Sequence, residues 1–237
     1  MTRSEGKITR ENAFDIIKKF ATEYRKELGK IPGEIIIVGG GSIMLNYKFR
    51  DATQDFDVIL KTVSGIEDVI RQFAEKNDLP IDWMNSDFLK TESYSSVLSE
   101  VSKHYYTLNN GTLEIRTVSG VYLIAMKLRA RRDYRNDISD TIGILIEEYE
   151  DGNHITFEQI QKAYVKLYHI EIPEELQDKM KTLCSMTIDQ LKDFYSQQNS
   201  IENELGGKII TYLENGANIN TKNVDEVIAK IKEKMGK

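Results

Sequence analysis

An apolar, β-branched segment that ends in consecutive glycines is the feature that most restricts how this chain can fold. Residues 34–38 (Glu-Ile-Ile-Ile-Val) have the composition of a buried strand, and Gly39, Gly40 and Gly41 follow directly. The short apolar stretch at residues 42–47 is predicted to be a helix. A strand that turns through glycines into a helix presents backbone N–H groups at the helix N-terminus. An anion such as phosphate can approach them closely because Cβ atoms are absent.

This glycine turn matches neither of the common phosphate-binding loops. The glycines are not followed by the Lys-Ser/Thr pair of a P-loop, and there is no Gly-x-Gly-x-x-Gly spacing with a downstream acid for a ribose. Three glycines between a strand and a helix also serve as a plain tight turn. The turn by itself therefore allows both a structural and a phosphate-binding interpretation.

Two aspartates in the next predicted strand, residues 55–60, give the turn a chemical partner. Asp55 and Asp57 are two residues apart, so on a strand they share one face with Cβ atoms roughly 6.6 Å apart. Phe56 and Val58 indicate that the opposite face is buried. Two carboxylates on one face repel each other unless the face is solvated or a cation lies between them. Mg²⁺ prefers such carboxylate oxygens together with substrate phosphates, and a solvated strand face is the alternative.

The order of the predicted elements indicates an α+β fold with a helical C-terminal region. Apolar residues recur at helical spacing over residues 9–28 and 64–76, and Asn-Asn-Gly at residues 109–111 predicts a β-hairpin. We therefore expect an α/β domain over residues 1–118 and a helical region over residues 119–237. The helices of the second region are predicted at residues 120–132, 136–149, 156–168, 173–183, 187–196, 201–214 and 223–235.

Composition excludes several classes of protein. The chain has 237 residues and a formal net charge of -6, so a generally basic surface for nucleic acid is not expected. A membrane span is not expected either, because no apolar run is long enough. The single cysteine, Cys184, rules out an internal disulfide framework and suits the cytoplasm. The three histidines are scattered without ligand spacing, which argues against a zinc site.

Together, the glycine turn and the aspartate pair resemble the first motif of the DNA polymerase β-like nucleotidyltransferases. In that superfamily an apolar residue and Gly-Gly or Gly-Ser precede Asp-x-Asp at the start of a strand, as residues 37–42 and 55–58 do here. Residues 82–85 and 125–140 are similar to later segments of its small bacterial branch, which includes AbiEii-type toxins and related uncharacterised proteins. The resemblance covers roughly residues 30–150 and implies a nucleotidyltransferase-type mixed sheet with flanking helices.

This resemblance implies metal-dependent transfer of a nucleoside monophosphate from an NTP. Asp55 and Asp57 are then expected to hold Mg²⁺ or Mn²⁺. The phosphates are expected to lie against the backbone of Gly39, Gly40 and Gly41. The side chain of the residue that follows these glycines, Ser42, is expected to help bind them.

Later parts of the chain supply candidates for the rest of the site. Lys127 and Arg131 lie one turn apart on a predicted helix, where they can neutralise the triphosphate and the leaving pyrophosphate. A solvated basic face is the alternative. Asp137 or Glu114 is expected to complete the carboxylate set. Arg116, two residues after Glu114 on the same strand face, offers Glu114 an ordinary ion pair instead.

The sequence leaves the acceptor open. By analogy with the toxin branch, a tRNA 3′ end is one candidate acceptor, and a cognate antitoxin protein is a candidate partner. A small-molecule adenylyltransferase of the antibiotic-modifying kind is a second hypothesis, which the acidic net charge favours. A third hypothesis is a catalytically inactive nucleotidyltransferase fold that binds a partner protein.

Overall fold

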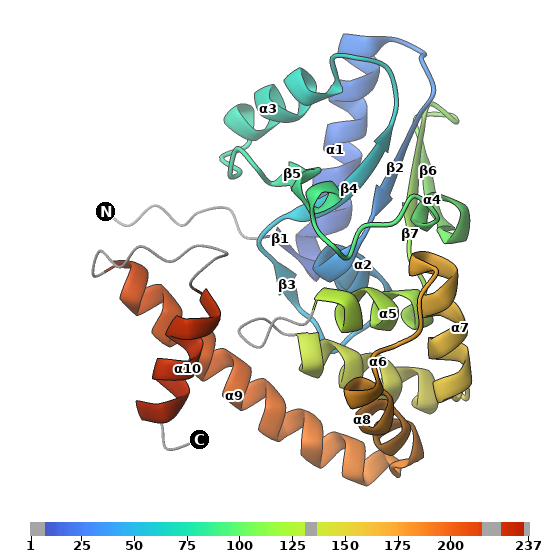
Figure 1. The fold of residues 1–237 in the computed structure, drawn as a ribbon. Helices are drawn as coiled ribbons and strands as arrows, with labels where there is room; N and C mark the ends of the chain where they lie inside the picture. Colours follow the sequence, from blue (N-terminus) through green and yellow to red (C-terminus); the bar gives the residue numbers. More distant parts are fainter. Residues whose placement is uncertain (1–7, 131–136, 215–223, 235–237) are drawn as a thin grey trace.

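The structure is a computed structural model that describes residues 8–130, 137–214 and 224–234. It has the predicted α+β fold, with a five-stranded mixed sheet in the order β5-β4-β2-β7-β6 (Figure 1). β2 is antiparallel to β4 and parallel to β7, β5 is parallel to β4, and β6 is antiparallel to β7. The strands of this sheet are β2 (Gly33–Ile37), β4 (Phe56–Lys61), β5 (Met84–Asn85), β6 (Lys103–Leu108) and β7 (Leu113–Thr117), and β1 (Ile8–Thr9) pairs separately with β3 (Ala52–Thr53).

The helices after β7 gather below the sheet in Figure 1, and the long α9 leads away from them to α10. No helix in the described part of the chain is long and apolar enough to cross a membrane. The helices are α1 (Arg10–Leu28), α2 (Gly39–Asn46), α3 (Ile66–Lys76), α4 (Leu98–Val101), α5 (Gly120–Ala130), α6 (Asp137–Glu150), α7 (Phe157–Tyr168), α8 (Glu174–Ser185), α9 (Ile188–Glu214) and α10 (Val224–Lys234), with a 3-10 turn at Asp87–Lys90.

Alternating side chains of β2 contribute to two separate parts of the core. Ile35 and Ile37 pack with apolar residues of α1 and α3. Ile36, together with Val38 just after the strand, packs on the other face with apolar residues of α5, α6 and α7. The β-branched run is buried on both faces, as its lack of polar alternation predicts. The C-terminal helices therefore share a core with the sheet that carries the glycine turn.

The predicted hairpin is confirmed, while one helix boundary is wrong. Asn109, Asn110 and Gly111 all have positive φ, at 53°, 56° and 89°, between β6 and β7. The two helices expected at residues 187–196 and 201–214 are a single helix, α9. The intervening Gln-Gln-Asn-Ser is polar but contains no Gly or Pro, so it does not interrupt the backbone hydrogen bonds of a helix.

Two helical glycines give the packing of the C-terminal helices a direct test. A Cβ at Gly143 in α6 would lie 2.6 Å from two atoms of the Phe49 ring, whereas a Cβ at Gly207 in α9 would meet nothing within 4 Å. We expect Gly143→Ala to lower the free energy of unfolding by about 1–3 kcal/mol through overpacking. Gly207→Ala should raise it by up to about 1 kcal/mol through helix propensity. Urea unfolding measures both, and a Gly143→Ala variant as stable as wild type would contradict this packing.

Candidate active site

The aspartate pair lies where β4 begins, on the face of the sheet that is turned toward α5. Phe56 and Val58 pack into the core beneath α1 and α3. Since side chains alternate along a strand, Asp55 and Asp57 point to the opposite side. The Nδ2 group of Asn85, on the neighbouring β5, donates a hydrogen bond of 3.0 Å to Oδ2 of Asp55 and so orients this carboxylate.

A cavity of about 290 Å³ opens in front of the pair. It brings Asp55 and Asp57 together with Gly39 and Lys127, which come from three different parts of the sequence. Among the described residues that line it, four are aspartates and one is a lysine, so their summed charge is negative. A polyphosphate would be repelled from such a wall unless cations lay between them. The four carboxylates belong to Asp55, Asp57, Asp82 and Asp87, the last of which also pairs with Lys90 at 2.8 Å.

At each of the three glycines of the turn, a side chain would approach a different neighbouring residue closely. Gly39 has φ of 56°, a conformation that favours glycine, and a Cβ there would lie 3.2 Å from Oδ2 of Asp57. A Cβ at Gly40 would lie 2.7 Å from the guanidinium of Arg50, and one at Gly41 would lie 2.5 Å from the Phe56 ring. The space left by the missing side chains is therefore occupied by protein atoms. Of the three glycines, Gly39 lines the cavity and Gly41 is buried, so what the turn can offer a phosphate is its backbone rather than open space.

Ser42 has a different place from the one the sequence predicts. Its side chain is fully buried. The hydroxyl donates to the carbonyl oxygen of Val118 at 3.3 Å and accepts the N–H of Val118 at 2.9 Å, and the Asn46 amide also contacts it at 3.4 Å. These contacts fasten α2 to the end of β7. The Ser42 hydroxyl is thus engaged in structural contacts rather than turned toward the cavity at the aspartate pair.

Lys127 belongs to a buried charge network between α5 and α6. Its ammonium nitrogen lies 2.8 Å from Oδ1 of Asp137 and 2.7 Å from Oδ2 of Asp140. Nη1 of Arg50 contacts both oxygens of Asp140, at 2.8 and 2.6 Å. Lys127 is 9% exposed, so the solvated basic face considered from the sequence does not describe this residue.

The network keeps the lysine charged. Burial by itself would lower the pKa of Lys127, but the carboxylates of Asp140 and Asp137 outweigh it, and the pKa lies above its ordinary value. The guanidinium of Arg50 acts in the opposite direction without reversing the result. Lys127 thus places a fixed positive charge on the wall of the cavity at neutral pH.

Glu114, another predicted member of the site, lies away from the aspartate pair, as the register of the strands shows. Asp57 is level with Val38, whose N–H donates to the Asp57 carbonyl oxygen at 2.9 Å. Glu114 is level with Glu34, four residues earlier on β2, which is about 13 Å along the strand. Glu114 also pairs with Arg116 at 2.6 Å, the alternative that the sequence offered. The structure therefore does not bring Glu114 to the aspartate pair.

Asp137 lies next to the candidate site rather than on its wall, and Arg131 is not among the described residues. Asp137 contacts Lys127 at 2.8 Å but is not among the residues that line the cavity at the aspartate pair; it lines a second, largely apolar cavity of about 700 Å³ that Lys127 also lines. Sequence reasoning did not single out Arg50 as a site residue, since its partner Asp140 lies 90 positions away in the chain. Asn85 was visible only as part of the segment that resembles the bacterial branch.

The donor set fits a divalent cation only if a substrate completes it. Within residues 8–130, 137–214 and 224–234, no group of three or more His, Cys, Asp or Glu side chains is arranged to hold a metal ion. Asp55 and Asp57 supply two carboxylates at most to one ion. Mg²⁺ commonly binds proteins through one or two carboxylates and takes its remaining ligands from water and substrate phosphates. The pair is thus suited to a metal that arrives with a nucleotide.

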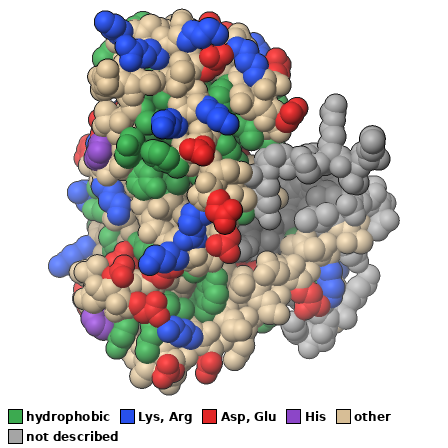
Figure 2. Space-filling view, turned by 180° about the vertical axis from the view of Figure 1, so that it is seen from behind, with side chains coloured by type: hydrophobic (Ala, Val, Ile, Leu, Met, Phe, Trp, Pro, Cys, Tyr) green, Lys and Arg blue, Asp and Glu red, His purple; other side chains and the backbone are tan. Residues whose placement is uncertain are grey.

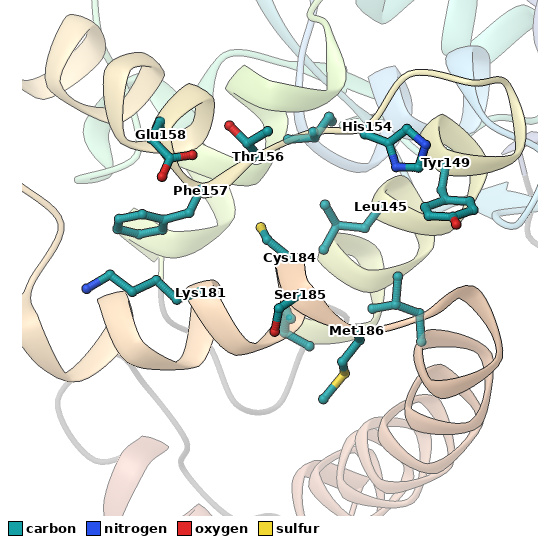
Figure 3. Close-up of a pocket in the computed structure, with 13 residues that line it drawn as sticks. Leu145, Tyr149, His154, Thr156, Phe157, Glu158, Lys181, Cys184, Ser185 and Met186 are labelled. Carbon is teal, nitrogen blue, oxygen red and sulfur yellow. The ribbon is translucent and has the colours of Figure 1, made fainter.

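A separate cavity of about 300 Å³ lies between the α6–α7 connection and α8 (Figure 3). Tyr149, His154, Phe157 and Cys184 line it, and none of its lining residues is shared with the cavity at the aspartate pair. Burial raises the pKa of Cys184 to about 11, so its thiol is protonated at neutral pH and is a poor nucleophile. The Cys184 thiol therefore does not mark this cavity as a second reactive site.

A family model described as a nucleotidyltransferase of unknown function (DUF6036) matches residues 13–172. The matched stretch contains the glycine turn, the aspartate pair and the whole Lys127 network, and it ends after α7. No curated protein and no solved structure matches the chain significantly.

The buried network predicts unequal effects for two aspartate substitutions. Asp140→Ala would leave Lys127 and Arg50 short of a buried partner, and we expect it to lower the free energy of unfolding by about 3–5 kcal/mol. Asp68→Ala is the matched control, because Asp68 forms an exposed pair with Arg71 and should lose less than about 0.5 kcal/mol. Chemical denaturation measures both values. Equal, small losses in the two variants would show that the network does not hold α5 and α6 together.

Proposed function

Because the chain belongs to this family of nucleotidyltransferases, we propose that it transfers a nucleoside monophosphate from an NTP to an acceptor and releases pyrophosphate. The observation that carries the proposal is the cavity in which Asp55, Asp57, Gly39 and Lys127 meet. It combines carboxylates for a metal, N–H donors at a helix start and one fixed cation. Those are the groups that a polyphosphate substrate requires.

In this proposal the aspartates are the metal-binding residues. Asp55 and Asp57 would hold Mg²⁺ or Mn²⁺, which would supply charge neutralisation for the triphosphate and orient it for in-line displacement. Asn85 would keep the Asp55 carboxylate turned into the cavity through its 3.0 Å hydrogen bond. Asp57, inside β4, is fixed by the sheet itself, because its carbonyl oxygen accepts the N–H of Val38.

The first turn of α2 would bind phosphate oxygens through its backbone. The N–H groups of Gly39, Gly40 and Gly41 have no acceptor one turn earlier within the helix, and the partial positive charge of the helix start favours an anion. Gly39 itself lines the cavity. Arg50 packs over Gly40, and its charge is balanced by the Asp140 carboxylate.

Lys127 would stabilise the leaving group. An ammonium group has three N–H donors, and Asp137 and Asp140 take two of them. The remaining donor can contact a phosphate oxygen in the cavity that Lys127 lines. Because the two carboxylates fix the ammonium nitrogen in place, little reorganisation is needed as charge develops on the pyrophosphate.

The chemical step forms one bond and breaks one. A hydroxyl oxygen of the acceptor attacks the α-phosphorus of the NTP while the bond between that phosphorus and the oxygen bridging to the β-phosphate breaks. The hydroxyl proton is released to solvent, and pyrophosphate leaves carrying the electron pair of the broken bond. Residues on the cavity wall position the triphosphate, so most of the rate enhancement comes from orientation and charge stabilisation.

The acceptor is either a tRNA 3′ end or a small hydroxyl compound. The tRNA acceptor, a toxin role and a cognate antitoxin follow from the resemblance to the AbiEii-type branch. On the face drawn in Figure 2, Lys and Arg side chains are interspersed with Asp and Glu. Such a mixed surface, like the net charge of -6, favours a small acceptor or a short RNA end over a long duplex.

Calorimetry and label transfer test the proposal together. Wild type should bind at least one of the four NTPs in the presence of Mg²⁺, and it should transfer label from α-³²P-labelled NTPs to total RNA or to small molecules of a lysate. Asp57→Ala should reduce transfer by roughly a hundredfold or more, because the metal–triphosphate is no longer held. Labelled RNA would identify the macromolecular acceptor, and labelled small molecules the other kind.

The matched control for this experiment is Glu114→Gln. Glu114 is a carboxylate on the same sheet but away from the pair, so this variant should transfer label as wild type does. Wild type that binds none of the NTPs, or Asp57→Ala that binds Mg²⁺–NTP unchanged, would contradict the proposed function. Binding without transfer to either class would favour the partner-binding alternative.

A further inference from the structure

The first turn of α6 decides where two of the network's carboxylates lie. Asp137 is the first residue of α6, and Asp140 follows one turn later. Both side chains are buried and both contact the Lys127 ammonium. The N–H groups of a first helical turn have no acceptor within the helix, so this turn depends on acceptors from elsewhere to stay formed.

Glu202 supplies those acceptors from α9. Its Oε1 accepts the N–H of Ile138 at 3.0 Å, and its Oε2 accepts the N–H of Ser139 at 3.2 Å. Glu202 is 3% exposed and lies 63 residues beyond Ser139 in the chain. A carboxylate at a helix N-terminus also interacts favourably with the helix dipole. One side chain of α9 thus holds the start of α6 from outside.

Neighbouring contacts fasten α9 to the same region. The ring of Tyr195 on α9 meets the ring of Phe49 edge-on, with centroids 6.0 Å apart. Phe49 in turn packs against Gly143 of α6 and precedes Arg50, which contacts Asp140. In Figure 1 the middle of α9 runs close beneath α6. The contacts that hold α9 in place therefore adjoin the charge network that contains Arg50 and Asp140.

Glu202 is an acid in a buried place that disfavours its ionised form. Burial raises the pKa of Glu202, although the hydrogen bonds from Ser139 and Ile138 act against this shift. An acid whose pKa is raised in the folded state makes the ionised folded protein less stable than it would be otherwise, above that pKa.

We propose that Glu202 is a positioning residue for nucleotide binding. By fixing the first turn of α6 it holds Asp137 and Asp140 against Lys127, and so sets the place of the ammonium group on the cavity wall. Glu202 lies outside the stretch that the family model matches, residues 13–172. The inference rests on the proposed function of the cavity.

The test compares three variants at a temperature where circular dichroism shows all of them folded. Glu202→Ala removes both acceptors, and we expect it to bind Mg²⁺–NTP about tenfold more weakly than wild type, the size of one lost cap. Glu202→Gln keeps an acceptor oxygen and should recover most of the affinity. Glu204→Ala is the matched control, because Glu204 is an exposed acid on the same helix that pairs with Lys208 at 2.9 Å. It should bind as wild type does.

Hydrogen exchange separates positioning from a purely structural cap. The amides of Ile138 and Ser139 should exchange faster in Glu202→Ala and not in Glu204→Ala. In a Lys127→Met background, Glu202→Ala should cause little further loss of affinity, because the two residues act in series. Faster exchange with unchanged affinity, or affinity losses that simply add, would overturn the inference. Wild type that binds no NTP would instead refute the proposed function of the cavity.

Discussion

The ammonium group of Lys127, buried between two carboxylates, is the interaction on which the rest of this site depends. A buried charge without partners would cost the fold several kcal/mol, so the lysine requires Asp137 and Asp140 in place. That requirement fixes α6 against α5. Arg50 balances the second carboxylate and ties in the segment between α2 and β3. The network thus connects α5 to α6, and it also holds the Lys127 ammonium group at the cavity.

The glycine turn and the aspartate pair form the opposite wall, and they depend on each other. Gly39 leaves room for the Asp57 carboxylate, and Gly41 leaves room for the Phe56 ring that anchors the strand between the two aspartates. The turn therefore shapes the carboxylate pair as much as it offers N–H groups to phosphate. The wall is acidic and the proposed substrate is anionic, so the proposed divalent cation would screen the repulsion between them.

Local signals in the sequence predicted most of the fold and several of the residues that the structure brings together in one cavity. The β-branched run, the Asn-Asn-Gly hairpin and the helical periods predicted the elements, and the spacing of Asp55 and Asp57 predicted a shared face. What local patterns could not provide were contacts between distant residues. The pairing of Arg50 with Asp140, and the capping of α6 by Glu202, span 90 and 64 positions. Glu114 had the expected flanking residues, but strand register, which a single strand does not encode, placed it elsewhere.

In the proposed complex, a metal-bound nucleotide lies in one cavity between Lys127 and the pair Asp55 and Asp57. A crystal structure with Mn²⁺ and a non-hydrolysable NTP analogue tests it most directly, because anomalous scattering locates the ion independently of the nucleotide. We predict Mn²⁺ at about 2.1 Å from oxygens of both aspartates, with the phosphates turned toward Gly39 and Lys127. An ion bound away from the pair, or a nucleotide seated in the apolar-walled cavity behind Lys127, would contradict the account.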